Sequence, residues 1–338
     1  MSEGYIVPSI MCIVEGDGED AAVRSLVRRI VTDINPNTYC DVHYSQVGGL
    51  IVARVFSRFI LALALTALAC SSTRNAHASE APTTGTLQIV ATVGGQPDDI
   101  TTDARGRLVW GDLARGTVDR LDGGRVTTIA TGLSLPEGIV VLPAGAIVVA
   151  EQGRDRIVRI DRNGARTVLD TLRPVPGQEG VDGIGRDPRS GELLIPDAPR
   201  GTVLGVGADG RHARVIARGL GRPVAAALDA YGDILVPDEH LGTLVVISPK
   251  GTIRDEGAFA TPDDVAVAPT GRVWITTLGD GGLWTIDPGA RTPYRVLTGL
   301  SNPQGLTLDR CGDPVVVDQN SARIVRWLLT PTAARCPF

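Results

Sequence analysis

The sequence has no excess of basic residues. Its 338 residues include 33 Lys and Arg against 38 Asp and Glu, which gives a formal net charge of -5, and the basic residues do not cluster. Proteins that bind nucleic acid place clustered positive charge against the phosphate backbone. The charge pattern therefore excludes nucleic acid as an expected partner.

Aromatic residues and long hydrophobic runs are also scarce. Aromatic residues make up 4% of the chain, and the apolar run FILALALTALAC at 59–70 has 12 residues, whereas a membrane-crossing helix needs about 20. In contrast, 41 Gly and 22 Pro favour many short strands joined by tight turns over long helices. The sequence contains no G-x-S-x-G elbow, no H-E-x-x-H motif and no phosphate-binding glycine loop.

A secretory signal is predicted within residues 52–85. Arg54 and Arg58 precede the apolar run and small residues follow it, which is the order of the parts of such a signal. Two processing routes fit. TALAC loosely matches a lipoprotein box with Cys70 as the acylated residue, and AHA at 76–78 matches a signal-peptidase site. Both routes predict an exported chain that is periplasmic, extracellular or anchored to the cell envelope by a lipid. The lipid anchor is the only membrane attachment that we expect.

Residues 1–51 precede this signal, although a secretory signal normally begins a chain. We therefore expect this segment to be a wrongly extended or fused stub. YIVPSIMCIVEGDGEDAAVRSLVRRIV resembles the opening strand, glycine turn and helix of a TOPRIM-like family, in which the residue at the Glu15 position helps to hold a metal. The D-x-D motif that completes that metal site is absent before the signal, so the resemblance implies no activity.

From residue 86 onward, one pattern recurs six times. Each copy begins with a short motif at the start of an expected strand, here called the strand-start motif. The motifs are PDDI at 97, PEGI at 136, VDGI at 181, PVAA at 223, PDDV at 262 and PQGL at 303, with spacings of 39, 45, 42, 39 and 41 residues. A glycine follows each motif after nine or ten residues. A period of this size with several short strands predicts an all-β, six-bladed β-propeller over 86–338, one four-stranded blade per repeat.

The two ends of this region are expected to meet. TLQIVATV at 86–93 matches the outer strand of each repeat but precedes the first motif, so it should complete the sixth blade and close the ring. Cys311 and Cys336 both fall on one face of that blade. In an exported chain we expect them to form a disulfide.

The repeat predicts two sets of polar residues around the central channel. The residues in the second position of the strand-start motifs should surround the channel mouth: Asp98, Glu137, Asp182, Val224, Asp263 and Gln304. The acids among them are called the ring acids below. The ends of the second strands carry Asp112, Glu151, Asp197, Asp238, Thr277 and Asp318, called the second-strand residues. For this second set we expect a structural role, because such side chains accept backbone N–H bonds in the next loop.

The ring acids need a compensating partner. Two carboxylates about 5 Å apart repel each other by roughly 3 kcal/mol at an effective dielectric constant of 20. Proton uptake, a bound cation or a wide, solvated mouth would each relieve this repulsion. Ca²⁺ accepts carboxylate, amide and water oxygens in flexible geometry, so Asp98, Glu137, Asp182, Asp263 and Gln304 are predicted metal ligands for Ca²⁺ or another divalent cation.

Residues 86–338 resemble six-bladed propellers of the NHL and regucalcin/gluconolactonase type. The segments PEGI, VDGI and PDDV are similar to the positions from which those enzymes present calcium ligands. The resemblance implies that Glu137, Asp182 and Asp263 bind the cation, which polarises a lactone carbonyl, and that a ring carboxylate such as Asp263 or Glu137 acts as base. The asparagine ligand of those enzymes is missing here, and the fourth repeat offers Val224.

Three alternative functions are therefore expected, and the first is preferred. The first is a divalent-cation-dependent hydrolase of a small lactone or ester at the acidic mouth. The second is a non-catalytic propeller that binds an extracytoplasmic protein, peptide or glycan, and the third is a metal-dependent lyase. His240, in PDEHLG, is a further expected base, with a solvated loop residue as the alternative.

Overall fold

The computed structural model describes residues 9–15, 40–47, 50–57 and 85–329. The chain divides into two compact units, residues 1–76 and 77–338, which are described separately. Over the described residues, no helix combines the length and apolar character needed to cross a membrane.

The first unit contains one antiparallel sheet of three strands in the order β1-β3-β2. The strands are β1 (Ser9–Glu15), β2 (Cys40–Val47) and β3 (Leu50–Ser57). The boundary predicted between stub and signal, at residues 51 and 52, falls within β3. The apolar run at 59–70, Cys70 and the AHA segment lie outside the described residues.

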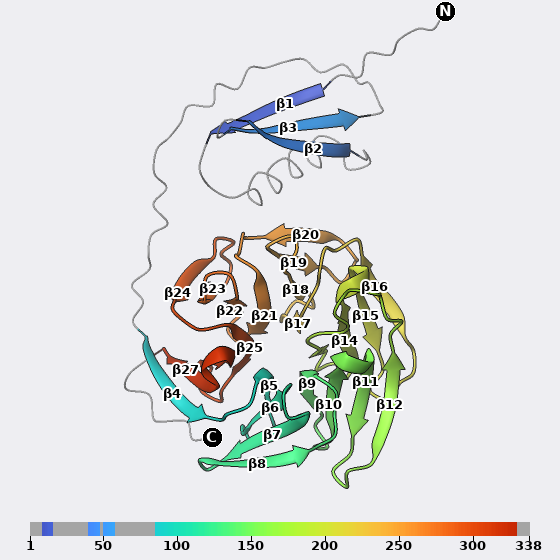
Figure 1. The fold of residues 1–338 in the computed structure, drawn as a ribbon, viewed down its shortest axis with the longest axis vertical. Helices are drawn as coiled ribbons and strands as arrows, with labels where there is room; N and C mark the ends of the chain where they lie inside the picture. The colour runs from blue at the N-terminus through green and yellow to red at the C-terminus, as the bar shows by residue number, and fades with distance from the viewer. Residues whose placement is uncertain (1–8, 16–39, 48–49, 58–84, 330–338) are drawn as a thin grey trace, which may run out of the picture. The chain divides into compact units, whose positions relative to one another are not determined.

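The second unit is the predicted six-bladed propeller, with six four-stranded antiparallel sheets arranged around an axis (Figure 1). Blade 1 is β5 (Pro97–Thr102), β6 (Leu108–Asp112), β7 (Thr117–Asp122) and β8 (Arg125–Ala130). Blade 2 is β9 (Pro136–Val141), β10 (Ile147–Glu151), β11 (Arg156–Ile160) and β12 (Arg166–Thr171). Blade 3 is β13 (Gly185–Arg186), β14 (Leu193–Asp197), β15 (Thr202–Val206) and β16 (Arg214–Arg218).

The remaining blades follow the same order. Blade 4 is β17 (Ala227–Leu228), β18 (Ile234–Asp238), β19 (Thr243–Ile247) and β20 (Ile253–Glu256). Blade 5 is β21 (Pro262–Val267), β22 (Val273–Thr277), β23 (Gly282–Ile286) and β24 (Tyr294–Leu297). Blade 6 is β25 (Pro303–Leu308), β26 (Pro314–Asp318), β27 (Arg323–Leu328) and β4 (Thr86–Thr92). Three short 3₁₀ turns follow second strands: η1 (Gln152–Arg154), η2 (Ala198–Arg200) and η3 (Gln319–Ser321).

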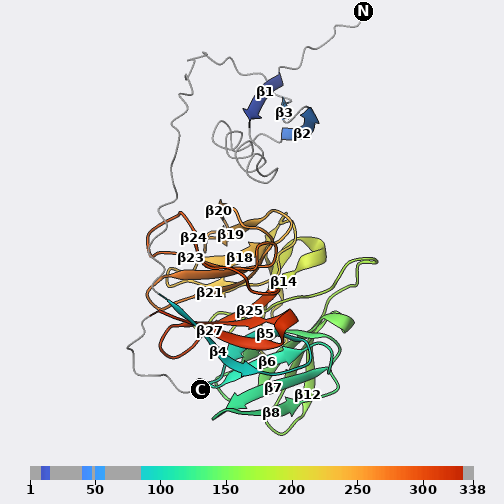
Figure 2. The ribbon, with the colours of Figure 1, turned by 60° about the vertical axis from the view of Figure 1, so that its left-hand side comes forward.

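The predicted ring closure is confirmed. β4 pairs antiparallel with β27, from Thr86 opposite Leu328 to Thr92 opposite Arg323, and the two strands lie side by side in Figure 2. The first strand of the propeller sequence is therefore the outer strand of its last blade. This pairing joins the two ends of the propeller sequence and gives the sixth blade four strands, as in the other blades.

The recurring glycine sits in the turn between the first and second strands. Gly145 has a φ of +84°, which glycine adopts without a steric penalty, and the equivalent glycines of the other blades have φ between +76° and +91°. This conformation explains why glycine recurs nine or ten residues after each strand-start motif. The repeat period seen in the sequence is thus the period of a backbone turn.

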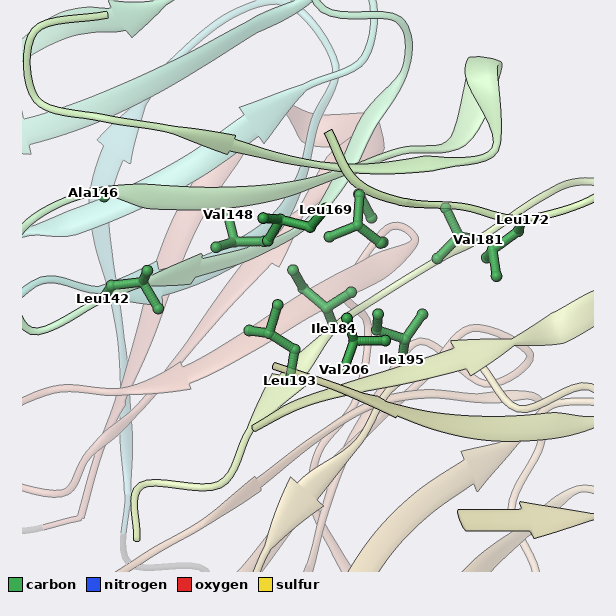
Figure 3. Close-up of a cluster of buried hydrophobic side chains, with 12 residues drawn as sticks. Leu142, Ala146, Val148, Leu169, Leu172, Val181, Ile184, Leu193, Ile195 and Val206 are labelled. Carbon is green, nitrogen blue, oxygen red and sulfur yellow. The ribbon is translucent and has the colours of Figure 1, made fainter. Parts of the chain in front are cut away.

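Hydrophobic clusters fill the spaces between successive blades. Between blades 2 and 3, Val148 and Ile157 are fully buried against Leu193 and Ile195, as Figure 3 shows for most of this cluster. Among the described residues, five other clusters occupy the equivalent spaces around the ring. Burial of this apolar surface holds the blades together, so the inner strands are fixed around the axis.

The first strands of blades 3 and 4 are shorter than the sequence predicts. β13 and β17 have two residues each, whereas the other first strands have six. The backbone ahead of β13 bonds to the next blade instead, because Gly183 N–H donates to the Val224 carbonyl at 2.7 Å. In blade 4, by contrast, the backbone ahead of β17 keeps a bridge between Pro223 and Asp238, the last residue of β18.

Candidate functional site

The ring acids meet at the channel mouth, as the repeat predicts. Glu137 in β9 experiences repulsion from Asp182, Asp98 and Asp263, which come from three other blades. Close approach of the inner strands makes this possible. Gly138 N–H donates to the Asp182 carbonyl at 3.3 Å, and a Cβ on Gly138 would lie 2.5 Å from Ile184 N. A side chain at position 138 would therefore push blades 2 and 3 apart.

Each ring acid has its own side-chain donor. Gln319 Nε2 donates to Asp98 Oδ2 at 2.6 Å, and Gln152 Nε2 donates to Glu137 Oε2 at 2.5 Å. Arg222 Nη2 donates to Asp182 Oδ2 at 3.3 Å. Three of the ring acids are thus paired with donors that come from other positions of the repeat.

Gln304 is the donor to the fourth ring acid, Asp263. With its amide oriented to satisfy both neighbours, its nitrogen donates to the two Asp263 oxygens at 3.0 and 3.1 Å, and its oxygen accepts from Asn302 Nδ2 at 2.9 Å. Asn302 Nδ2 also donates to Gln319 Oε1 at 2.8 Å. A chain of amides therefore links the donor of Asp263 with the donor of Asp98.

Burial and mutual repulsion raise the pKa of every ring acid. Burial raises the pKa of Asp98 to about 7, and burial together with repulsion from Asp98 raises the pKa of Asp182 to about 8 against the opposing effect of Arg222. The pKa values of Glu137 and Asp263 lie well above their usual range for the same reasons. The mouth thus holds carboxyl groups that retain protons near neutral pH.

One guanidinium lies among these acids. Arg222 ion-pairs with Glu179 at 2.9 Å and with Glu239, in addition to its contact with Asp182. Glu179 belongs to the long segment between β12 and β13, so this segment reaches the mouth. Three acidic side chains therefore share this one guanidinium at the mouth.

The sequence predictions missed Gln152, Arg222, Glu239 and Gln319. Three of them share a signal, since Gln152, Glu239 and Gln319 each directly follow a second-strand acid. The polar residues at this position all contact the ring acids or Arg222. Arg222 precedes the strand-start motif of blade 4, the blade whose ring position is Val224, and it brings a cation where that blade has no ring acid.

A second pair of acids lies one residue beyond the ring. Asp99 accepts from Ile100 N and from Ile139 N in blade 2, while Asp264 accepts from Val265 N and from Leu306 N in blade 6. Burial raises the pKa of Asp99 well above its usual range and that of Asp264 to about 6. Because each carboxyl bridges two blades through backbone N–H groups, these acids hold inner strands in place.

The second-strand acids accept backbone N–H bonds, as the sequence predicts, but most of the donors lie in the loop before the blade and not in the next loop. Asp238 is fully buried and accepts backbone N–H bonds from Gly221, Arg222 and Leu241 at 2.6 to 2.9 Å. Asp112, Glu151 and Asp318 likewise accept backbone N–H bonds from the preceding inter-blade loop. Arginines complete the pairing of most of them.

Two other predicted residues lie elsewhere. His240 is exposed in the loop after β18, and its side chain makes no hydrogen bond or ion pair to a described residue, so the structure does not bring it to the ring acids. Cys311 is disulfide-bonded. Its predicted partner, Cys336, lies outside the described residues.

The donor set at the mouth suits a hard divalent cation, because it consists of carboxylate and amide oxygens. The side chains do not form a complete coordination site. Over the described residues, no three or more His, Cys, Asp or Glu side chains converge to hold a metal ion. Gln152, Gln319 and Arg222 donate hydrogen bonds to three of the ring acids instead, so cation binding would require these donors to move away.

Comparisons with known proteins find similar chains by sequence and by structure. No family model matches the chain, and the TOPRIM-like resemblance of residues 1–51 has no support from them. The chain is 29% identical over 202 residues to virginiamycin B lyase of Nocardia farcinica, which covers 59% of this chain and 68% of that protein.

Solved structures share the architecture. A gluconolactonase from Xanthomonas campestris superposes with a TM-score of 0.63 and 16% identity, over 72% of this chain and 89% of that one. An inactive histidine-to-alanine variant of virginiamycin B lyase from Staphylococcus aureus, crystallised with quinupristin, gives 0.57 and 15% identity, over 74% and 91%. This chain has the fold of the lactonase and lyase propellers.

Proposed function

We propose that the channel mouth is the active site of a divalent-cation-dependent hydrolase that acts on a small lactone or ester. The supporting observation is the concentration of four ring acids from four blades at the axis, three of them buried and Asp182 partly buried, with one guanidinium among them. Such a cluster is costly to maintain, since each carboxyl loses hydration and repels the others. A ligand that supplies positive charge would remove this cost.

Asp98, Glu137, Asp182, Asp263 and the Gln304 amide oxygen would hold the cation, Ca²⁺ being the first choice because its coordination tolerates irregular oxygen cages. When bound, a divalent cation polarises a carbonyl oxygen and favours attack by water. Release of Asp98 from Gln319, and of Glu137 from Gln152, would free the carboxylate oxygens. The glutamine amides would then be available to the substrate oxygens.

The residues have separate tasks in this proposal. Asp263 is the base that takes a proton from the attacking water. The Gln304 amide fixes the orientation of the Asp263 carboxyl group from one side. Glu137 lies opposite, as a ligand with a second potential role as base. Arg222 lies beside Asp182 and would stabilise the carboxylate that ring opening produces.

Similarity to virginiamycin B lyase favours a second candidate, a lyase. A lyase and a hydrolase both need a base, but the lyase removes a proton from carbon and leaves a double bond, whereas the hydrolase adds water. The inactive Staphylococcus aureus enzyme carries a replaced histidine. In the propeller of this chain, His212 and His240 are both exposed. This difference supports carboxylate-based hydrolysis.

We also propose that the chain is exported, on the basis of the predicted signal at 52–85, with cleavage after Ala78 and acylation at Cys70 as the alternative outcomes. Mass spectrometry of the protein from its natural host distinguishes them. Cleavage gives a mature N-terminus at Ser79, whereas acylation gives a lipid-modified Cys70. Peptides from residues 13–50 would contradict the proposal that residues 1–51 are a stub.

The function is tested first by calorimetric titration of chelator-treated protein with Ca²⁺. We expect saturable binding and a rise in melting temperature. Glu137→Gln and Asp263→Asn should weaken binding at least tenfold, whereas Asp209→Asn, an exposed turn acid in blade 3, should bind as the wild type does. A flat titration of the wild type would remove the hydrolase and leave the non-catalytic propeller that binds a protein, peptide or glycan.

A panel of lactones and aryl esters then tests the reaction. Hydrolysis gives products that gain one water, whereas elimination gives a product of unchanged total mass with a new double bond and its ultraviolet absorbance. We expect Asp263→Asn to lower kcat at least a hundredfold. Turnover unchanged by Asp263→Asn and Glu137→Gln would show that the ring is not the active site.

A further inference from the structure

A second concave site lies between blades 1 and 2. We call it the basic groove, a cavity of about 590 Å³ lined by the turns at 103–107, 143–145 and 161–164 and by the strands between them. Strands β5 and β9 begin at the channel mouth and end at this groove, so the two sites lie at opposite ends of the same strands. The volume is within the usual range for small-molecule sites.

Four arginines line the basic groove: Arg105, Arg107, Arg120 and Arg162. Arg107 is neutralised by Asp103 at 2.6 Å and Asp122 at 2.7 Å. Asp161, another acid of the lining, pairs with Arg159 at 2.7 Å. The two acids of the lining, Asp103 and Asp161, are therefore already ion-paired with Arg107 and Arg159.

The other three guanidinium groups lack such partners. Among the described residues, no carboxylate ion-pairs with Arg105, Arg120 or Arg162. Arg120 lies on β7, the third strand of blade 1, and its Nε is buried without a hydrogen-bond partner. A buried N–H without an acceptor costs free energy, and rotation of the Arg120 side chain toward an anion in the groove would relieve that cost.

The floor of the groove consists of apolar side chains. Val109 from blade 1 and Ile147 and Ile160 from blade 2 are buried, whereas Ile129 and Val141 are partly exposed. Guanidinium groups at the edge and these two partly exposed side chains suit a ligand with an anionic group and an apolar body. Such a body would cover Ile129 and Val141, which a free inorganic anion would leave in contact with water.

We propose that the basic groove binds an amphipathic organic anion, an aryl or alkyl carboxylate or sulfonate, at a site separate from the acidic mouth. The anionic group pairs with Arg120 and Arg162, and the apolar body covers the floor between β8 and β9. The mouth presents mainly carboxyl and amide groups and offers this anion no comparable set of unpaired guanidinium groups, so the two ends of the channel strands suit different ligands.

Fluorescence titration of the full chain with 8-anilinonaphthalene-1-sulfonate tests this proposal. We expect one saturable site whose affinity falls with rising salt. Arg120→Gln and Arg162→Gln should each weaken binding about tenfold or more, because each removes a charge-assisted hydrogen bond. Octanoate should compete with the probe. N-phenyl-1-naphthylamine, which has the apolar body without the charge, should bind the wild type and both variants alike.

Two control variants show whether probe binding depends on the arginines of the groove. Arg211→Gln changes an exposed arginine, with 78% of its side chain accessible, in the equivalent turn of blade 3 and should bind the probe as the wild type does. Glu137→Gln should also leave the probe affinity unchanged, so failure of the proposed function does not affect this test. Arg162 is exposed, so Arg162→Gln tests the site even if Arg120→Gln fails to fold. Wild-type affinity in Arg162→Gln, or equal loss in Arg211→Gln, would overturn the proposal.

Discussion

Replacing Asp98 by asparagine should stabilise the propeller in the absence of cations at alkaline pH. Asp98 is only 6% exposed and accepts hydrogen bonds from Gln319 at 2.6 Å and from the backbone of Asp99. Asparagine has nearly the same shape, and its carbonyl oxygen keeps the bond from Gln319. The substitution therefore removes a titrating charge and changes little else.

The size of the effect follows from the pKa of Asp98, which burial raises from 3.8 to about 7. The unfolded chain releases this proton near pH 3.8, but the folded chain retains it until about pH 7. Stability from this group is thus present below pH 3.8 and is lost as pH rises to 7. The complete loss corresponds to about 4 kcal/mol. Asparagine cannot ionise, so Asp98→Asn avoids this loss.

Urea unfolding in chelator, at about pH 4 and pH 8, measures the difference. Trp110 and Trp274, at most 1% exposed, report the unfolding of blades 1 and 5 by fluorescence. At pH 8 the variant should exceed the wild type by up to about 4 kcal/mol, and at pH 4 the two should agree within about 1 kcal/mol. The exposed control Asp209→Asn should show no such pH dependence. A variant less stable than the wild type at pH 8 would refute the idea that the ring acids destabilise the unliganded fold.

Three further substitutions or treatments test the supporting structure. Asp238→Ala should lower the free energy of unfolding by about 3 kcal/mol in urea, because three buried backbone N–H groups lose their acceptor. Arg326→Met should lower it by about 3 kcal/mol or more, since Asp309, now 2.9 Å from Arg326, would stay buried without that partner. Reduction of the Cys311 disulfide should lower it by about 3 kcal/mol if the loop ends at Cys336; an unchanged melting temperature after reduction would contradict that pairing.

Features that recur with the repeat could be predicted from the sequence. The turn glycines adopt the same positive φ in every blade, so their spacing marks the blades directly. The pairing of β4 with β27 could also be predicted, because TLQIVATV is an outer strand without an inner one before it. The ring acids could be placed at the mouth because they share one position in the repeat.

Features that depend on contacts between blades were missed. Gln319 meets Asp98 across 221 residues of sequence and a blade boundary, and no property of Gln319 alone indicates this contact. The late start of β13, ahead of which Gly183 bonds to Val224 of the next blade, was likewise not predicted. Periodicity describes one blade at a time, so it cannot specify which side chain of a neighbouring blade will neutralise a given carboxyl.

The hydrogen-bond donors separate the structural acids from those that can change partners. Asp238 and Asp264 are held by backbone N–H groups, which cannot leave without unfolding a strand or loop. Glu137 and Asp263 are held by glutamine amides, which need only a side-chain rotation to release them. Both kinds of carboxyl are buried, so burial alone does not distinguish them. Because binding requires groups whose partners can be exchanged, a ligand at the axis should engage Glu137 and Asp263 and leave Asp238 and Asp264 in place.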